Sequence, residues 1–246
     1  IMTTKNQCSI VIITLNEERN IANLLNDLCR QSHKDFEVIV VDSASTDTTV
    51  ETAQKFADRL DLKTIVMDGR GTSLGRNTGA ENARYERLLF LDADVRLQPD
   101  FLAKSLTLLE QKGLWVAGGR IGSSDKEFLM RLGIGIFDWA MWLTQFFFPT
   151  CTGACIFSTK TVHRTIGGFD LSIRLCEDCD YVNRAGKTFR FRMLPIHFEF
   201  NPRRLKQDGI FHLGGVYLRA NIRRFFKGEL RNDEIAYPFG HYKEKQ

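Results

Sequence analysis

Four short apolar runs alternate with polar, helix-like segments over the first hundred residues of the chain. The runs are CSIVIIT, FEVIVVD, LKTIVMD and RLLFLD, which begin at Cys8, Phe36, Leu62 and Arg87. Runs that are apolar at nearly every position are typical of strands buried on both faces. Their alternation with helices predicts an α/β domain with a mostly parallel sheet flanked by helices. One predicted helix starts near Ser45 or Thr46 as N-cap, and another lies between Pro99 and Gly113.

In parallel sheets of this kind, ligands bind beyond the carboxyl ends of the strands. The polar residues expected there are Thr14, Asn16, Asp42, Asp68, Asp92 and Asp94. A dinucleotide-binding turn would need glycines after the first strand, but TLNEERN has none and carries two acids. If the chain is extended around Asp92 and Asp94, both carboxylates face one side. Such a pair suits Mn²⁺ or Mg²⁺ bound together with substrate phosphates.

Bulk composition excludes several classes of protein. The 246 residues carry a net charge of +4, too small to indicate nucleic-acid binding. Six cysteines in a chain of this length do not indicate a disulfide scaffold, and the opening residues resemble a strand rather than a signal peptide. We therefore expect a cytoplasmic protein. The most apolar stretch, residues 128–148, is interrupted by Arg131 and Asp138 and is not expected to cross a bilayer.

The second half is less regular and ends in a basic tail. We expect strands in LWVAGGRI, GACIFS and FRFRMLPIHFEF, a short helix in EDCDYVNRAGK, and an apolar helical insertion over residues 126–149. No linker divides the chain, so residues 1–204 are expected to form one domain and residues 205–246 a basic amphipathic helical tail. The insertion and the tail suit peripheral contact with a membrane, or packing on the sheet or a second copy.

Five segments together resemble the glycosyltransferases of family 2, and they occur in that family's order. They are SIVIITLNEERNI, VVDSASTDTT, GRGTSLGRNTGAENA, LFLDADVRL and TGACIFSTKTVHRTIGGFDLSIRLCEDCDYVNR. The resemblance implies a GT-A fold and an inverting, metal-dependent transfer of a sugar from a nucleoside-diphosphate donor of the UDP or GDP type. Leu15 stands where the family often has an aromatic residue, and Ser43 stands where a second acid is common. The resemblance therefore does not specify which nucleotide base, uracil or guanine, the donor carries.

The resemblance also implies roles for individual residues. Asp42 would bind the nucleotide base, and Thr14, Asn16 and Glu17 would line the nucleotide turn. Arg76 would face the diphosphate, Asp94 would bind Mn²⁺ or Mg²⁺, and Asp92 would hold the ribose or a metal-bound water. Asp178 would act as general base with Glu177 as its orienting neighbour. Candidates for phosphate contacts are His197, Arg203 and Arg204.

Several alternatives remain open at this stage. Glu177, Asp178 and Asp180 would also satisfy the dipole of a helix N-terminus without any catalytic role. Four thiols, Cys151, Cys155, Cys176 and Cys179, would allow a structural zinc site, which we consider the weaker interpretation. A nucleotidyltransferase of similar fold and a non-catalytic nucleotide-sugar-binding protein are the competing functions. The acceptor, a hydroxyl or a phosphate on a lipid or a cell-surface glycan, is not specified.

Overall fold

The structure, a computed structural model, describes residues 7–122, 127–200 and 210–231. The strands are β1 (Cys8–Thr14), β2 (Phe36–Asp42), β3 (Leu62–Val66), β4 (Arg87–Asp92), β5 (Val95–Arg96), β6 (Val116–Ile121), β7 (Cys155–Thr159) and β8 (Phe191–Phe200). The helices are α1 (Ile21–Cys29), α2 (Thr49–Gln54), α3 (Thr72–Asn82), α4 (Phe101–Gln111), α5 (Phe128–Thr144), α6 (Lys160–Thr165), α7 (Glu177–Gly186) and α9 (Ile210–Lys227).

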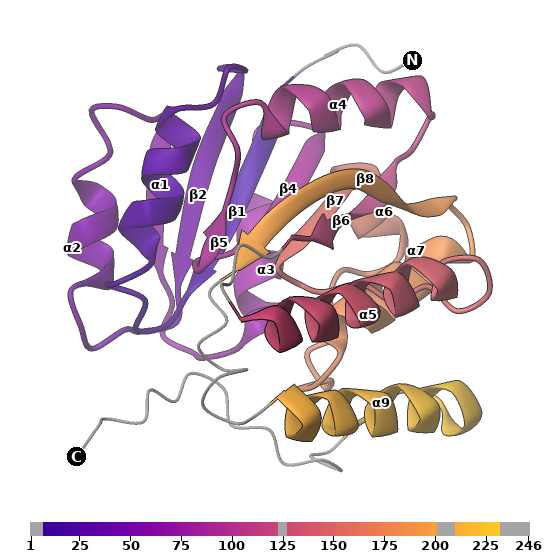
Figure 1. Ribbon diagram of the computed structural model, residues 1–246. Helices are drawn as coiled ribbons and strands as arrows, with labels where there is room; N and C mark the ends of the chain where they lie inside the picture. Colours follow the sequence, from indigo (N-terminus) through magenta and orange to yellow (C-terminus); the bar gives the residue numbers. More distant parts are fainter. Residues whose placement is uncertain (1–6, 123–126, 201–209, 232–246) are drawn as a thin grey trace.

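The strands form one sheet in the order β3-β2-β1-β4-β7-β6-β8-β5. The four strands of the first half, β3, β2, β1 and β4, are parallel, while β7 runs antiparallel to both of its neighbours. Figure 1 shows helices on both sides of this sheet. The predicted α/β architecture is confirmed, and the second half adds the mixed strands.

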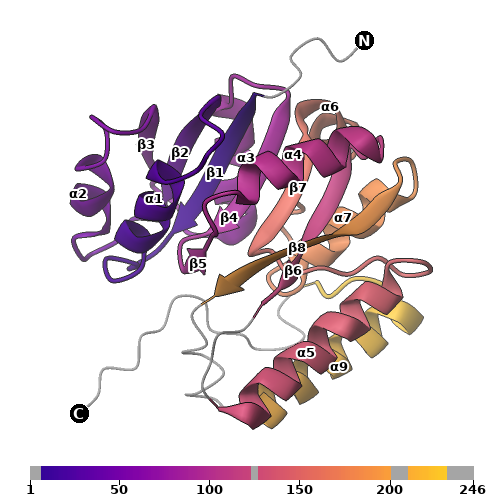
Figure 2. The same cartoon turned by 45° about the horizontal axis from the view of Figure 1, so that its top comes forward.

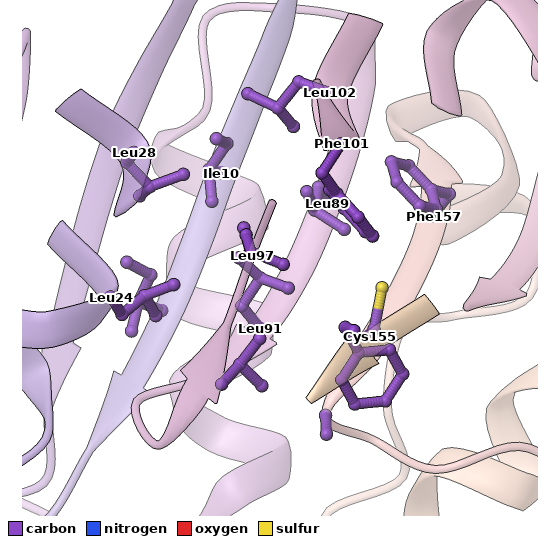
Figure 3. Close-up of a cluster of buried hydrophobic side chains, with 14 of the residues drawn as sticks. Ile10, Leu24, Leu28, Leu89, Leu91, Leu97, Phe101, Leu102, Cys155 and Phe157 are labelled. Carbon is purple, nitrogen blue, oxygen red and sulfur yellow. The ribbon is translucent and has the colours of Figure 1, made fainter. Parts of the chain in front are cut away.

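Alternating side chains of each strand pack on opposite faces of the sheet. On one face, Ile10 and Leu89 contact α1 and α4 through residues such as Leu24 and Phe101 (Figure 3). On the other face, Val11 and its neighbours pack against α3, α6 and α7. Full burial of such aliphatic side chains contributes about 1.5–3 kcal/mol each. The two clusters explain why the strand sequences are apolar at nearly every position.

One predicted helix start is wrong. Residues 45–48 belong to a loop, and α2 begins only at Thr49, with Thr48 as the N-cap residue. The polar atoms of Ser45 and Thr46 are used elsewhere: Ser45 binds Asp42, and the Thr46 amide donates to Asn16 Oδ1 at 2.9 Å. Ser and Thr favour helix starts because their side chains bind backbone groups, but the same property serves loops.

The predicted apolar insertion is the helix α5, and it exposes much of its apolar surface. Its inner face buries Met130, Ile134, Asp138 and Met141. Asp138 accepts two hydrogen bonds from Arg120 of β6, at 2.8 and 2.6 Å, which fixes the helix to the sheet. None of the helices in the described ranges is both long enough and apolar enough to span a bilayer.

Candidate functional site

The candidate site lies at the carboxyl edge of the parallel strands. In the register of the sheet Thr14 of β1 lies opposite Asp42 of β2, and Ile13 lies opposite Asp92 of β4. The ends of the three strands are therefore level with one another. The edge expected from the sequence to bind a ligand does carry Thr14, Asp42 and Asp92 side by side.

Asp42 is fully buried and ties two loops together. One carboxylate oxygen accepts from Thr14 Oγ1 at 2.7 Å and from Ser45 Oγ at 2.6 Å, and the other accepts from the Ser45 amide at 2.7 Å. Asn16 has a positive φ of 55°, and its backbone N–H donates to Ser45 Oγ at 2.8 Å. The Glu17 amide donates to Thr49 Oγ1 at 2.8 Å. These bonds order the loops that would surround a nucleotide.

Arg76 of α3 joins residues from both halves of the chain. Its Nη2 donates to Asp92 Oδ1 at 3.0 Å, and its Nη1 donates to Glu177 Oε1 at 2.8 Å. The arginine is buried, whereas the side chain of Asp92 is 37% exposed and that of Glu177 is 11% exposed. The predicted diphosphate contact of Arg76 stays a prediction.

Gly153 and Phe169 confine the guanidinium of Arg76. The carbonyl of Gly153 accepts from Nη2 at 3.3 Å, and the ring of Phe169 lies 5.3 Å from the guanidinium carbon. A Cβ atom at Gly153 would lie only 2.4 Å from Nη2 and 3.2 Å from Asp178 Oδ2. Only glycine leaves room for the side chains of Arg76 and Asp178 at their observed positions.

Asp178 stands at the start of α7, next to this cluster. Its carboxylate accepts from the Cys179 amide at 2.7 Å and from the Gly153 amide. Burial, with the negative charge of Glu177, raises the pKa of Asp178 to about 6, although Arg76 and the two amide donors act in the opposite direction. A carboxylate with a pKa near 6 is suited to accept a proton close to neutral pH.

The carboxylates proposed for metal binding lie on a turn. Strand β4 ends at Asp92, and Ala93 and Asp94 already turn towards β5, so the extended segment expected from Asp92 to Asp94 is not present. Both side chains are partly exposed at the edge. Within the described ranges no group of three or more His, Cys, Asp or Glu could hold a metal ion. A pair of partly exposed carboxylates fits a divalent ion that also binds substrate phosphates.

The three phosphate-contact candidates lie apart from this cluster or outside the described residues. His197 is exposed on β8, opposite Arg120 of β6. Three residues further along, Phe200 lies opposite Val95, which follows Asp94. Arg203 and Arg204 lie outside the described residues. The phosphate roles of these three residues stay predictions.

The four cysteines are spread over different surroundings. Cys155 belongs to the core on one face of the sheet and Cys151 to the core on the other. Cys179 Sγ donates to the carbonyl of Cys151 at 3.2 Å. Cys176 and Cys179 pack against α9. They form no four-thiol cluster, and burial raises the pKa of Cys155 well above its usual range.

Three important contacts were not anticipated from the sequence. The backbone of Gly153 and the ring of Phe169 confine the guanidinium of Arg76, and Arg224 of α9 has a fully buried side chain. Gly153 and Phe169 lie inside segments TGAC and GGFD that the family resemblance had marked, so their positions were visible but not their roles. Arg224 lies in the basic tail, where its burial could not be distinguished from that of its exposed neighbours.

Comparison with known proteins places this arrangement in a family. A family model described as glycosyl transferase family 2 matches residues 9–173. A glycosyltransferase of PGL/p-HBAD biosynthesis from Mycobacterium bovis is 32% identical over 179 residues, which cover 70% of this chain and 67% of the relative. The poly(ribitol-phosphate) β-N-acetylglucosaminyltransferase TarS from Staphylococcus aureus is 32% identical over 107 residues, 42% of this chain and 19% of TarS.

Solved structures show the same fold. TarS in complex with UDP-GlcNAc superposes with a TM-score of 0.65 and 20% identity, covering 78% of this chain and 58% of TarS. The mannosyltransferase PcManGT from Pyrobaculum calidifontis, in complex with GDP-Man and Mn²⁺, gives a TM-score of 0.70 at 19% identity, covering 89% and 65%. The chain thus spans less than two thirds of TarS, and the predicted GT-A fold is confirmed. The chain belongs to glycosyl transferase family 2, which confirms both the family and the class of enzyme, a glycosyltransferase, predicted from its motifs.

Proposed function

We propose that this protein transfers a sugar from a nucleoside-diphosphate donor to an acceptor, with inversion at the anomeric carbon. The observation that carries this proposal is the bridge made by Arg76. It joins Asp92, at the edge of the donor-side sheet, to Glu177, which immediately precedes Asp178. A carboxylate with a raised pKa thus stands next to the edge where family relatives would bind the donor.

The proposed step uses Asp178 as the only base. Its carboxylate takes the proton of the acceptor hydroxyl as that oxygen bonds to the anomeric carbon. The bond from the same carbon to the diphosphate oxygen breaks on the opposite face. Glu177 and Arg76 hold the carboxylate segment in place, and the buried surroundings limit competition from water.

A divalent ion is part of the proposal. Asp94 and Asp92 would hold Mn²⁺ or Mg²⁺, which supplies positive charge for the leaving diphosphate when it is bound. PcManGT was solved with GDP-Man and Mn²⁺, and TarS with UDP-GlcNAc, which supports a donor of the GDP or UDP type. The two loops that hydrogen-bond through Asp42 would surround the nucleotide base of the donor. The limits of the transferase domain, residues 1–204, and of the tail, residues 205–246, are likewise proposals.

A thermal-shift panel of nucleoside diphosphates with and without Mn²⁺ tests this assignment. We expect one nucleotide to raise the melting temperature only when Mn²⁺ is present, by about 5–10 °C at 100 times its Kd. Asp94→Asn should remove the metal-dependent part of this shift. Asp100→Asn, a carboxylate paired on the surface with Lys104, serves as control. Absence of a shift with every nucleotide would exclude the proposed donor class.

We also propose that α5 and α9 contact a lipid surface, on the inner face of the cell membrane, which would suit a lipid-linked acceptor. The two helices lie side by side (Figures 1 and 2), with the rings of Phe137 and Tyr217 6.0 Å apart. Their outward positions are apolar: Leu132, Ile136, Trp139 and Leu143 on α5, and Leu218, Ile222, Phe225 and Phe226 on α9.

Charge favours an anionic lipid surface as the partner of this apolar face. Arg219 and Lys227 are exposed beside the apolar residues of α9, and Trp139 remains 56% exposed on α5. A helix with cations beside bulky apolar residues lies in the interface of a bilayer. No acidic residue occurs within the last turns of α9 before Glu229.

Pelleting with vesicles containing phosphatidylglycerol tests the membrane proposal. We expect the protein to pellet at low salt, and the double variant Ile222→Glu with Trp139→Glu to remain in the supernatant. Val66→Glu is the matched control, because Val66 is an exposed apolar residue on β3, away from both helices. If the double variant instead converts a dimer into a monomer and vesicles make no difference, the face is a contact between copies of the chain.

A further inference from the structure

Helix α9 has a second face, turned towards the start of α7. Ala220 of α9 and Leu230 beyond it are buried against Leu175, Cys176 and Cys179. These three residues immediately precede and follow Glu177 and Asp178 in the chain. The segment that holds the proposed base is therefore covered by a helix near the end of the described chain.

Arg224 is the polar centre of this contact. Its side chain is completely buried, and its Nε and Nη2 donate to the two carboxylate oxygens of Glu229 at 2.5 and 2.9 Å. Nη1 donates to Asn221 Oδ1 at 2.8 Å, and the ring of Phe148 lies 5.2 Å from the guanidinium carbon. Arg224 lies one helical turn beyond Ala220, which is buried against Cys176 and Cys179.

The segment under Arg224 has an unfavourable backbone conformation that needs support. Cys176, the N-cap of α7, has φ 65° and ψ 30°, a left-handed conformation that is uncommon for residues other than glycine and asparagine. A residue held in such a conformation costs on the order of 1–3 kcal/mol and persists only where its surroundings fix it. Here the thiol of Cys179 is anchored to Cys151, and α9 closes the other side.

We propose that Arg224, fixed by Glu229, is a positioning residue for Asp178. It acts through Cys176 and Cys179 by holding the turn that presents the carboxylate, and it does not touch the reacting atoms. The proposal rests on the proposed role of Asp178 as base. It also explains the two cysteines beside the carboxylates: their small apolar side chains form the surface on which α9 packs. The match to the family model ends at residue 173, before this contact.

Steady-state kinetics with Arg224→Met and Glu229→Gln test the proposal. We expect kcat for transfer to fall by ~10- to 100-fold, because small displacements of a catalytic group have effects of that size. The KM for the donor and the thermal shift with nucleotide and Mn²⁺ should not change. Arg224→Lys should recover part of kcat. Arg84→Met is the matched control, since it removes an arginine paired with Glu37 and Asp61 at a distant edge of the molecule.

Thiol labelling supplies a readout that does not depend on activity. Cys176 and Cys179 are buried, so we expect them to react slowly with a maleimide in the native protein and faster in Arg224→Met, with the sites identified by mass spectrometry. Cys155, in the opposite core, should stay protected in both. Unchanged kcat in both Arg224→Met and Glu229→Gln would overturn the proposal, and faster labelling without a loss of kcat would show a structural contact only.

Failure of the inference and failure of the proposed function give different results. If Asp178→Asn retains full transfer, the base assignment fails, whatever the labelling of the two thiols. If Asp178→Asn is inactive but Arg224→Met and Glu229→Gln keep full kcat, only the positioning role fails. Should Arg224→Met lose its fold, the isosteric Glu229→Gln carries the same test.

Discussion

Replacing Asp178 by asparagine is expected to lower kcat for sugar transfer by ~10²- to 10⁴-fold, the range found for loss of a general base. Asparagine has nearly the same shape and can still accept a hydrogen bond from the amide of Gly153 or Cys179, but it cannot take a proton. Donor affinity should stay close to that of the native protein, because the proposed role of Asp178 is towards the acceptor rather than the donor. Transfer assays with isothermal titration of the donor measure the two quantities separately.

Asp180→Asn is the control that distinguishes catalysis from a helix-dipole role. Asp180 lies in the same first turn of α7 and is paired with Arg184 at 2.6 Å. A favourable charge at a helix N-terminus is worth about 0.3–1 kcal/mol at either position. We therefore expect Asp180→Asn to reduce stability and leave most of kcat. Equal kinetic effects of the two variants would assign both carboxylates to the helix dipole.

The pH dependence of transfer follows from the same carboxylate. Burial and the neighbouring Glu177 raise the pKa of Asp178 to about 6, so kcat should fall as the pH drops below 6 and the base becomes protonated. Glu177→Gln removes the like charge and should move this acid limb to lower pH. A pH–rate profile of the two proteins checks the direction, and a limb that does not move would exclude Asp178 as the titrating group.

Stability should vary with pH in the opposite sense to activity. The folded-state pKa lies above the ordinary value of 3.8, so the stabilising contribution of protonated Asp178 is present below pH 3.8 and is lost as the pH rises through about 6. Relative to Asp178→Asn, the native protein should lose about 1–3 kcal/mol between pH 4 and pH 7. Urea unfolding of both proteins at the two pH values measures this difference.

The parallel half of the sheet could be predicted because each of its strands can be recognised from a short stretch of neighbouring residues. An apolar run such as CSIVIIT indicates a buried strand from neighbouring residues alone, and Gly113 marks a helix end with φ 59° just past α4. The position of Thr14, Asp42 and Asp92 at one edge then follows from parallel register. Nothing beyond the strand pattern was needed for that part of the site.

The rest of the site depends on contacts that sequence spacing does not specify. Arg76 and Glu177 are 101 positions apart, and the family motif suggested a diphosphate for Arg76 rather than this carboxylate. The burial of Arg224 depends on how α9 lies beside α5, which the alternation of arginine with apolar residues left undetermined. The start of α2 was misplaced because Ser45 binds the carboxylate of Asp42, an equally good partner for its hydroxyl.

Arg76→Met is expected to reduce the free energy of unfolding by ~3–5 kcal/mol, the cost found when one partner of a buried ion pair is removed. The variant leaves Asp92 and Glu177 facing each other across a site from which their shared cation is gone. Methionine fills much of the space but neutralises neither charge. Urea denaturation at pH 7 measures the loss, and transfer should fall with it because Glu177 no longer has its anchor.

The double variant Arg76→Met with Glu177→Gln identifies the cause of that loss. Because the second substitution removes one of the two uncompensated carboxylates, the double variant should be more stable than Arg76→Met by about 0.5–3 kcal/mol, the usual range for coupled neighbours. Arg84→Met is the comparison, because the Arg84 side chain is 55% exposed, and it should cost less stability than Arg76→Met. If Arg76→Met is as stable as Arg84→Met, solvent reaches the carboxylates and the bridge does not hold the two halves of the site together. A loss of about 3–5 kcal/mol that Glu177→Gln partly reverses would instead show that the buried guanidinium of Arg76 balances the carboxylates of both Asp92 and Glu177.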